Sequence, residues 1–544
     1  MQRSTLAKQV PLLFCIATIA IYFYGLGHLP LIGPDEPRYA QVAREMFERR
    51  DFITPTLGGH TWFEKPALLY WMMMASYYLF GVAEWTARLG SACAGLLTIL
   101  FVYLIGKRAE KADQKLKSLA LWSAAALASS ASLIVFARGA SFDIIVTWTI
   151  TGALGCFFAF ESESESKKQR NWLIGFYAFI GASLLGKGLV GIVIPFGVIF
   201  LYYALRRRWM ERTLIISLVW GVPLAVLLAS IWYGPVIVTH GWQFIDEFFI
   251  QHHFARYLSN KYRHPQPFYF YLPVMALLAL PWTIFLTTAL INLKWRASFV
   301  ENRFRLFALA WLVVPLAFFS LSGSKLPGYV LPALPGAMLL VGEQLMRVVR
   351  GEEKAAAPLR LTGALMLVAA VTVVIYAAHT MGMTITCALM IAAPEVLAGT
   401  YALLAKRQQQ QRISVSLIIV AVFCSEIIAL NCAVGRVSRR ESTRDLFEMA
   451  AAQGYASTRV VQLQTIEHNS EFYAAGRILY GADGQLLNYE NAQAVLEAAR
   501  RAPDGTLLVI TPPPYIQQFA ENKKAQWQLI GVNDDVALIA VKQK

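Results

Sequence analysis

Long apolar stretches alternate with short polar connections along most of the chain. The stretches at 11–27, 118–137, 213–233 and 361–378 are typical. A helix of about 20 apolar residues is as long as the hydrocarbon core of a bilayer is thick, about 30 Å. The pattern therefore predicts a polytopic, all-α membrane protein. The best fit has 13 spans, at 10–28, 88–106, 118–136, 144–160, 171–185, 188–205, 213–233, 271–292, 306–321, 329–346, 361–379, 383–405 and 413–433.

Lysine and arginine gather in every second connection between these stretches. Together with the N-terminus, those connections hold 25 basic residues, whereas the five outer connections after the first outer loop, at 137–143, 186–188, 234–270, 322–328 and 380–382, hold six. Cytoplasmic loops carry an excess of Lys and Arg, so the N-terminus and the basic loops are expected to face the cytoplasm. An odd number of spans then places the C-terminus outside. The first apolar run follows Arg3 and Lys8 and has no A-x-A cleavage site, so we expect a retained membrane helix.

The first outer loop, 29–87, is predicted to hold two helices on the membrane surface. Over 36–50, apolar residues recur at helical spacing; Asp35 is the expected N-cap, and Pro37 falls in the first turn, where proline is tolerated. The apolar stretch 66–80 is about 15 residues long, short for a span. If it did cross, the basic cluster that follows the next span would move outside. We therefore predict that it lies at the interface.

Residues 435–544 differ in character from the membrane domain predicted at 1–434. They contain 12 basic and 12 acidic residues. Short apolar runs alternate with helix-like stretches, which predicts a small outer α/β domain. It has no glycine-rich phosphate loop and no evident catalytic set, so the expected role is a structural or docking cap. The strands are expected at 459–464, 506–511, 526–532 and 535–541, and the helices at 489–501 and 513–523.

Composition and net charge limit the kinds of molecule that the protein is expected to bind. Of the 544 residues, 57% are hydrophobic and only 15% are charged, too few to cover a soluble surface. The net charge of +15 comes from the membrane domain and mostly from cytoplasmic loops, so it sets orientation and requires no nucleic acid. The six cysteines form no CxxC pair, so neither a zinc site nor a disulfide framework is expected from them.

Polar residues that could carry chemistry collect at the outer ends of the spans. Taken singly, most have a structural explanation, such as a helix cap for Asp35 or a lone interfacial lysine for Lys187. Taken together, they predict a cavity that holds a phosphate at membrane level, where Lys and Arg neutralise its oxygens. They are Asp35, Glu36, Arg38, Glu64, Lys65, Arg138, Asp143, Lys187, Lys325 and Tyr329.

Histidines raise the question of a metal. Four of the eight lie in the outer loop 234–270, including the adjacent His252 and His253. Imidazole is the commonest ligand of zinc-type metals and could join carboxylates from other loops. The spacing matches no single-loop metal motif, so these residues alone leave a metal site open.

The motifs at 34–40 (PDEPRYA), 64–66 (EKP) and 325–329 (KLPGY) resemble those of membrane glycosyltransferases that use polyprenyl-phosphate sugars. Within that group, the chain is most similar to the bacterial undecaprenyl-phosphate 4-amino-4-deoxy-L-arabinose (aminoarabinose) transferases, which modify lipid A. The resemblance covers the whole chain and implies a GT-C fold in the bacterial inner membrane, with the site and the C-terminal domain on the periplasmic side. The N-terminal motifs are shared with protein O-mannosyltransferases.

The resemblance also implies roles for individual residues. Asp35 and Asp143 match acidic residues near the reacting centre, with Lys65 as the third catalytic group. Glu64 and His253 match ligands of a divalent metal such as zinc; His252 is the alternative to His253. Contacts to the donor's lipid phosphate are implied for Lys65, Arg256 and Tyr329, with Arg38 near them. Lys325 is a further candidate for substrate binding on the outer side.

The expected reaction is transfer of aminoarabinose from undecaprenyl phosphate to a lipid A phosphate. An acceptor phosphate is largely ionised at neutral pH and needs no strong general base, unlike a hydroxyl. Two alternatives stay open. One is a protein O-mannosyltransferase, in which Asp35 would have to act as a base. The other is a lipid-linked sugar flippase, which the gathering of polar residues on one side disfavours.

Overall fold

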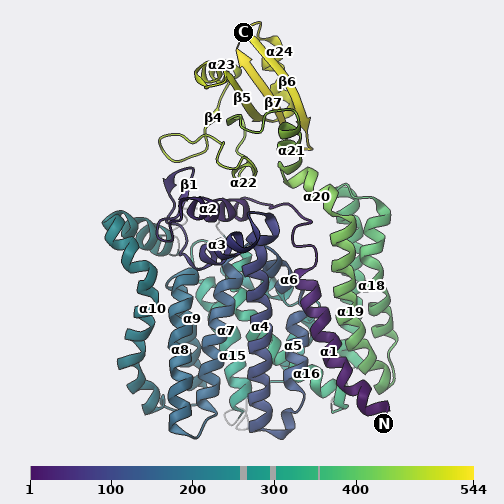
Figure 1. Ribbon diagram of the computed structural model, residues 1–544. Helices are drawn as coiled ribbons and strands as arrows, with labels where there is room; N and C mark the ends of the chain where they lie inside the picture. Colours follow the sequence, from purple (N-terminus) through teal and green to yellow (C-terminus); the bar gives the residue numbers. More distant parts are fainter. Residues whose placement is uncertain (1, 256, 258–265, 294–301, 353–355, 544) are drawn as a thin grey trace.

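The computed structural model describes residues 2–255, 257, 266–293, 302–352 and 356–543. Long helices pack side by side as a bundle, two short helices lie across one end of it, and an α/β unit sits beyond them (Figure 1). Within the described residues, eight helices are long and apolar enough to cross a membrane, or up to ten if each of two bent pairs is one span. The chain is therefore a polytopic, mostly helical membrane protein, as predicted.

The helices of the bundle follow the predicted spans, although the count of 13 stays a prediction. They are α1 (Gln2–Phe23), α4 (Glu84–Ala112), η1 (Gln114–Leu116), α5 (Leu119–Ala128), α6 (Ala131–Arg138), α7 (Phe142–Glu161), α8 (Ser166–Lys187), α9 (Val190–Leu205), α10 (Arg212–Phe244), the π-helical η2 (Ile245–Ala255), α12 (Tyr271–Leu278), α13 (Thr283–Ile291), α15 (Arg303–Ser320), η3 (Pro327–Ala333), α16 (Leu334–Arg350), α17 (Ala356–Ile375), η4 (Tyr376–Thr380), α18 (Ile385–Leu404) and α19 (Gln408–Cys432).

Two spans that were expected to be continuous are broken, and their breaks face each other. Helices α5 and α6 meet at 60°, and α12 and α13 meet at 117°. The Ser130 hydroxyl donates to the Leu278 carbonyl at 2.8 Å, and Trp282 Nε1 donates to Ser129 Oγ at 3.0 Å. Inside a membrane, freed backbone groups must be satisfied within the protein. Each break therefore supplies partners for the other.

The first loop holds the two expected surface helices. They are α2 (Asp35–Arg49) and α3 (Leu68–Phe80), with a short hairpin, β1 (Thr56–Leu57) and β2 (His60–Thr61), between them. One detail of the prediction is wrong, because Pro34 occupies the N-cap position of α2 and Asp35 already begins the helix. The Asp35 carboxylate is turned toward Arg38, which donates to it at 2.9 Å. The Asp35 carboxylate therefore does not cap the backbone N–H groups at the start of α2.

The C-terminal residues form an α/β unit around a five-stranded sheet with the order β4-β3-β5-β7-β6. Strands β3, β4 and β5 run parallel, and β7 pairs antiparallel with β5 and β6. The sequence predicted four of these five strands and missed the two-residue β4, and it also missed the helices α20, α21 and α22. The elements are α20 (Val434–Glu441), α21 (Arg444–Ala452), β3 (Val460–Leu463), α22 (Ser470–Tyr473), β4 (Asn488–Tyr489), α23 (Ala492–Arg501), β5 (Thr506–Thr511), η5 (Pro513–Ile516), α24 (Gln517–Glu521), β6 (Ala525–Val532) and β7 (Ala537–Gln543).

Side-chain alternation along β5 places a helix on each face of the sheet. Leu508 and Ile510 join the apolar cluster that contains Leu446 of α21. Leu507 and Val509 join the opposite cluster, which contains residues of α23. The period of two along a strand sends successive side chains to opposite faces, so both faces of β5 are buried.

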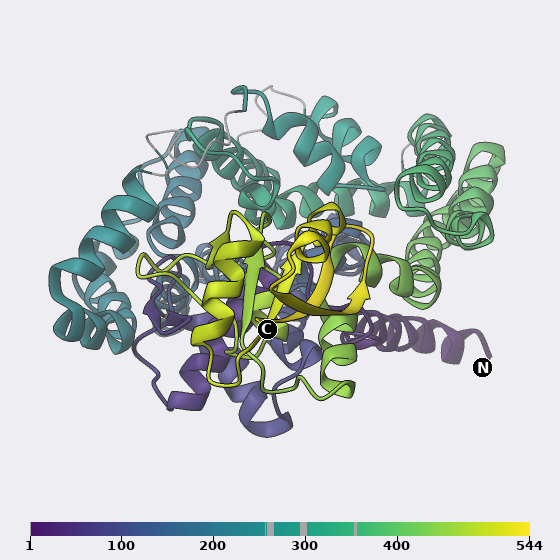
Figure 2. The same cartoon turned by 90° about the horizontal axis from the view of Figure 1, so that it is seen from above.

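This unit is fastened to α2 and to the loop that precedes it. Arg44 of α2 donates to the Phe472 carbonyl at 2.7 Å, and its guanidinium lies 4.1 Å from the centre of the Phe472 ring. The backbone N–H of Leu31 donates to the Tyr473 hydroxyl at 2.7 Å. Seen from above, the yellow unit lies over the middle of the bundle, with the green α17–α19 group to one side (Figure 2). The unit therefore contacts the first loop directly.

Arg88, in the first turns of α4, organises that loop from below. Its Nε and Nη2 donate to the two carboxylate oxygens of Glu36 at 2.7 and 2.8 Å. The same guanidinium donates to the carbonyls of Leu26, Leu29 and Pro30 at 2.6 to 2.7 Å. All five N–H groups of an arginine are thereby used. A forked pair of this kind is both strong and geometrically specific.

Glu36 carries the connection further. It accepts hydrogen bonds from the backbone N–H groups of Ile32 at 3.1 Å and Ala140 at 2.8 Å. The Glu36 and Arg88 side chains are about nine-tenths buried or more. One buried ion pair therefore holds together the loop after α1, the start of α2, the start of α4 and the connection between α6 and α7.

A disulfide joins Cys387, near the start of α18, to Cys432, at the end of α19. The expectation of no disulfide was wrong. It rested on the lack of a CxxC pair, whereas these cysteines are 45 residues apart and meet because the two helices pack against each other. The hydrogen bond from the Tyr24 hydroxyl to Asn431 at 2.9 Å links the same end of α19 to the segment after α1.

The Glu36–Arg88 pair yields a stability prediction. Replacing Arg88 with Gln leaves a buried carboxylate without its cation, which typically costs about 3–5 kcal/mol. We expect the melting temperature of the purified protein in detergent to fall by several degrees. The matched control is Lys168→Gln, which removes an exposed pair with Glu165 and should change the melting temperature little. Equal melting temperatures for the two variants would contradict the role given to Arg88.

Candidate functional site

Two cavities lie at the end of the bundle that α2 and α3 cover. One encloses about 440 Å³ and the other about 400 Å³. Lys65, Lys187 and Tyr329 line both of them. The cavities therefore adjoin at two cations and a phenol, which come from the first loop, the end of α8 and η3.

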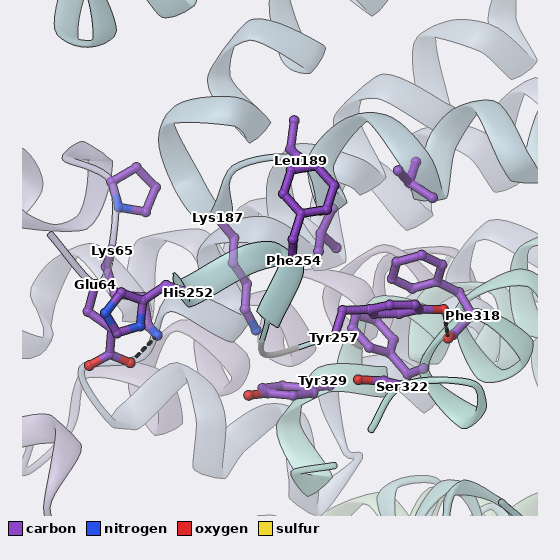
Figure 3. A pocket seen from close by; sticks show the side chains of 14 residues that line it. Glu64, Lys65, Lys187, Leu189, His252, Phe254, Tyr257, Phe318, Ser322 and Tyr329 are labelled. Atoms are coloured by element: carbon purple, nitrogen blue, oxygen red, sulfur yellow. Dashed lines mark hydrogen bonds and ion pairs between the residues drawn. The ribbon is translucent and has the colours of Figure 1, made fainter. Parts of the chain in front are cut away.

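The first cavity is mainly apolar. Its polar end is formed by Glu64, Lys65, Lys187, His252 and Tyr329, and Figure 3 shows Glu64, Lys65 and His252 gathered on one side. Lys65 Nζ donates to Glu64 at 2.6 Å. We call it the apolar cavity. Its hydrophobic wall consists of Pro66, Leu189, Val190, Val193, Phe254, Phe318 and Phe319, with Tyr257 beside them.

The second cavity is the polar one. Four anionic and four cationic side chains line it, and they come from the first loop, α4, the connection around α6 and α7, the end of α8, and α19. We call it the polar cavity. The charged residues are Asp35, Glu36, Asp143 and Glu426, with Lys65, Arg88, Arg138 and Lys187.

Lys187 stands between the two cavities. Its ammonium forms an ion pair with Asp143 at the start of α7 and lies 4.6 Å from the centre of the Tyr329 ring. The side chain is only 14% exposed. The interpretation of Lys187 as a lone interfacial lysine is therefore wrong. Sequence could not pair it with Asp143, because 44 residues and most of two helices separate them.

Among the four carboxylates that line the polar cavity, Asp35 has the most exposed side chain. Its side chain is 54% exposed, and it pairs with Arg38 at 2.9 Å. Tyr39, one turn along α2, lines the same cavity. Burial, reinforced by the carboxylates of Glu64 and Asp35, raises the pKa of Tyr39 well above its ordinary value. Tyr39 therefore stays protonated and can act as a hydrogen-bond donor but not as a base.

A sequence model of the family described as dolichyl-phosphate-mannose-protein mannosyltransferase (PMT) matches residues 10–295, slightly more than half of the chain. The chain belongs to the PMT family. It is therefore a glycosyltransferase by family, and both cavities described above draw most of their lining residues from the matched segment.

Curated relatives of this PMT-family chain carry a more specific name. The undecaprenyl phosphate-alpha-4-amino-4-deoxy-L-arabinose arabinosyl transferase of Pseudomonas aeruginosa is 32% identical over 354 residues. The protein of the same name from Aeromonas hydrophila is 32% identical over 367 residues. The matches cover 63% and 64% of this chain and 61% and 62% of the relatives. The chain thus spans about three fifths of the length of the relatives it matches.

The fold is shared with a solved structure over nearly its whole length. A crystal structure of ArnT from Cupriavidus metallidurans bound to undecaprenyl phosphate matches with a TM-score of 0.81, at 23% identity, over 98% of each chain. This PMT-family chain therefore has the ArnT-like GT-C fold that its motifs predicted.

The residues proposed as metal ligands are placed in part. Glu64 and His252 line the apolar cavity together (Figure 3). The position and contacts of the His253 side chain are outside the described residues, and so is Arg256. The structure thus brings His252, the alternative of the adjacent pair, to the cavity that holds Glu64.

Two of the predicted phosphate contacts are engaged elsewhere. Arg38 donates to the Pro34 carbonyl at 2.7 Å as well as to Asp35, and it is not among the residues that line either cavity. Lys325 is buried and donates to the Ser322 carbonyl at 2.5 Å, which fixes the turn before η3. Tyr329, by contrast, lines both cavities.

Sequence reasoning gave no role to Arg88 or Glu426, although both line the polar cavity. Arg88 is only the first residue of the predicted span 88–106. Glu426 is an acidic residue inside the predicted span 413–433, and a charge inside a span usually marks a function or a partner. That signal could have located it.

The position of Lys187 gives a testable difference between two lysines. Lys187→Met removes a cation shared by both cavities and leaves Asp143 unpaired, so sugar transfer should fall by about 100-fold or more. Lys325→Met removes a buried lysine that bonds to the backbone, so it should mainly lower the melting temperature. Initial rates and melting curves on both purified variants check this. Equal losses of transfer at equal stability would contradict the distinction.

Proposed function

We propose that this chain transfers 4-amino-4-deoxy-L-arabinose from undecaprenyl phosphate to a phosphate of lipid A. One observation carries the proposal. An apolar and a polar cavity adjoin at Lys65, Lys187 and Tyr329. The polyprenyl chain of the donor favours an apolar environment, whereas the anionic acceptor favours a polar one. The donor phosphate and the acceptor phosphate have to meet beside cations that neutralise their charge. The names of the curated relatives and the ArnT-like fold support the same reaction.

The donor fits the apolar cavity. Its isoprenoid chain would pack against side chains such as Val193 and Phe318, since burial of apolar surface is favourable. Its phosphate would then lie at Lys65 and Lys187. As the sugar leaves, charge grows on that phosphate, and preorganised cations stabilise it most in the transition state. Tyr329 lies beside this point and can donate a hydrogen bond.

The acceptor fits the polar cavity. Its phosphate oxygen forms a bond to the anomeric carbon while the bond from that carbon to the donor phosphate oxygen breaks. The electron pair leaves with undecaprenyl phosphate, and no proton has to be removed from an ionised acceptor. Asp35, which is about half exposed and lines this cavity, would stabilise positive charge on the sugar ring or orient the acceptor. Asp143 would hold the Lys187 ammonium in place.

A divalent metal, zinc being the expected one, stays a proposal. Glu64 would be one protein ligand, and the second would be His253, as expected from the resemblance, or His252, which lines the apolar cavity with Glu64. Among the described residues, no group of three or more His, Cys, Asp and Glu side chains could hold a metal. Catalytic zinc sites typically use three protein ligands. The described residues do not complete such a site, and we assign no step to a metal.

The proposed location is the bacterial inner membrane, with both cavities facing the periplasm. Two observations support this orientation. The basic loops gather at the opposite side in the sequence pattern. The Cys387–Cys432 disulfide joins the start of α18 to the end of α19, and the α/β unit follows α19 directly. Disulfides persist in oxidising compartments such as the periplasm.

Mass spectrometry of lipid A tests the reaction. Cells that produce the chain should carry lipid A heavier by one aminoarabinose, and Asp35→Asn should abolish most of that shift at unchanged protein level. Glu48→Gln, an exposed change on the same helix, is the control and should leave the shift intact. A glycosylated protein with unmodified lipid A would favour the mannosyltransferase instead. Movement of lipid-linked sugar between leaflets without release of undecaprenyl phosphate would favour the flippase.

Labelling of introduced cysteines tests the orientation. Asp504→Cys lies exposed on the α/β unit, and Lys168→Cys lies exposed at the start of α8. In intact spheroplasts, a membrane-impermeant maleimide should label the first variant, and it should label the second only after the membrane is opened. The unmodified chain gives the background of its own cysteines. The reverse pattern would overturn the orientation.

A further inference from the structure

Arg138 is a cation of the polar cavity that the reaction outlined above does not use. It ends α6, and its side chain is only 8% exposed. Its Nη1 donates to the Ile21 carbonyl near the end of α1 at 2.5 Å. Its Nε lies 3.5 Å from a carboxylate oxygen of Glu426, which belongs to α19. Both Arg138 and Glu426 line the cavity.

The other cations of this cavity are held more tightly. Arg88 meets Glu36 through two bonds of 2.7 and 2.8 Å and uses its remaining N–H groups on carbonyls. Lys65 lies 2.6 Å from Glu64, and Lys187 is in close contact with Asp143. The separation of 3.5 Å makes Arg138–Glu426 the loosest of these four ion pairs. Arg138 is therefore the cation whose carboxylate partner is displaced most easily.

The charge of the cavity sets the second condition. Its four anionic and four cationic lining residues balance. An incoming phosphate adds one to two negative charges, so it needs a cation that can exchange its present partner. Carboxylate and phosphate are both acceptors for the guanidinium fork. Glu426 thus occupies the position that a phosphate oxygen would take.

We propose that Arg138 binds the acceptor phosphate and that Glu426 is a resident carboxylate that the acceptor displaces. This rests on the proposed function, because it assumes that the acceptor enters the polar cavity. With no acceptor present, Glu426 keeps a cation inside the membrane protein paired, since an unpaired charge there is costly. When the acceptor binds, Arg138 turns its fork to the phosphate.

Arg138 also has a structural task, because it bonds to the Ile21 carbonyl. A loss of activity on substitution alone would therefore decide nothing. Glu426→Gln separates the two roles. It leaves Arg138 and its bond to α1 in place and removes only the competing negative charge. Arg138→Lys keeps the charge but loses the fork, so it reports on the geometry of binding.

The experiment measures steady-state transfer by the full-length protein in detergent, with purified lipid A as acceptor and undecaprenyl-phosphate aminoarabinose as donor. Arg138→Gln should raise the KM for lipid A by about 10- to 100-fold, as expected for the loss of hydrogen bonds to a charged group. The KM for the donor should stay within about two-fold. Arg138→Lys should fall between, and Glu426→Gln should lower the KM for lipid A below that of the unchanged protein.

Two further arms of the experiment identify the ligand. Inorganic phosphate should compete with lipid A in the unchanged protein and compete less in Arg138→Gln. Added phosphatidylglycerol should not change the effect of the substitutions, since the site is proposed for the acceptor and not for bulk lipid. A KM for lipid A that is unchanged in both Arg138→Gln and Glu426→Gln overturns the proposal. A fall in kcat that only parallels a fall in melting temperature also overturns it. A change in KM for lipid A that depends on added phosphatidylglycerol does the same.

The proposed function has a separate failure. If the unchanged protein transfers no sugar to lipid A, that function is wrong, whichever variants are made. If it does transfer sugar and the KM values do not move, only the assignment of Arg138 and Glu426 is wrong.

Discussion

The ion pair between Glu36 and Arg88 is the constraint on which the rest of this end of the molecule depends. A charged group at membrane level is tolerated only when it is paired and hydrogen-bonded. Arg88 meets that condition by using all its donors on Glu36 and on three carbonyls of the loop after α1. The loop therefore cannot move away from α4 without exposing a charge. Because Asp35 is adjacent to Glu36 in the chain, the ion pair also fixes the position of Asp35 beside the polar cavity.

In the proposed reaction, one cavity would hold the lipid-linked donor and the other the anionic acceptor. Hydrophobic side chains of α9 and α15 form one wall, whereas four anions and four cations line the other cavity. Lys187 belongs to both, and Asp143 restrains its ammonium. Because Lys65 and Lys187 lie where the cavities adjoin, the donor phosphate of the proposed reaction would meet the acceptor beside these two cations.

Much of this could be predicted from the sequence, and the rest could not for identifiable reasons. The surface helix near 36–50 and the strand at 506–511 follow from local periodicity, which the fold preserved. The bond between Lys187 and Asp143, the disulfide of Cys387 with Cys432, and the pairing of Arg138 with Glu426 join residues far apart in the chain. Spacing says nothing about such contacts. The breaks in two spans were missed because their hydrogen bonds are made to each other.

The hydrogen bond between Tyr473 and Leu31 bears on how the molecule can be divided. All residues that line the two large cavities precede the α/β unit in the chain, with Glu426 the last of them. The positions of these lining residues alone would suggest that the membrane part forms the site without the α/β unit. Yet Leu31, in the loop that leads to Asp35, donates its backbone N–H to Tyr473 of the α/β unit. The α/β unit therefore supports the loop that leads to Asp35, and a chain cut before this unit would lose that hydrogen-bond acceptor.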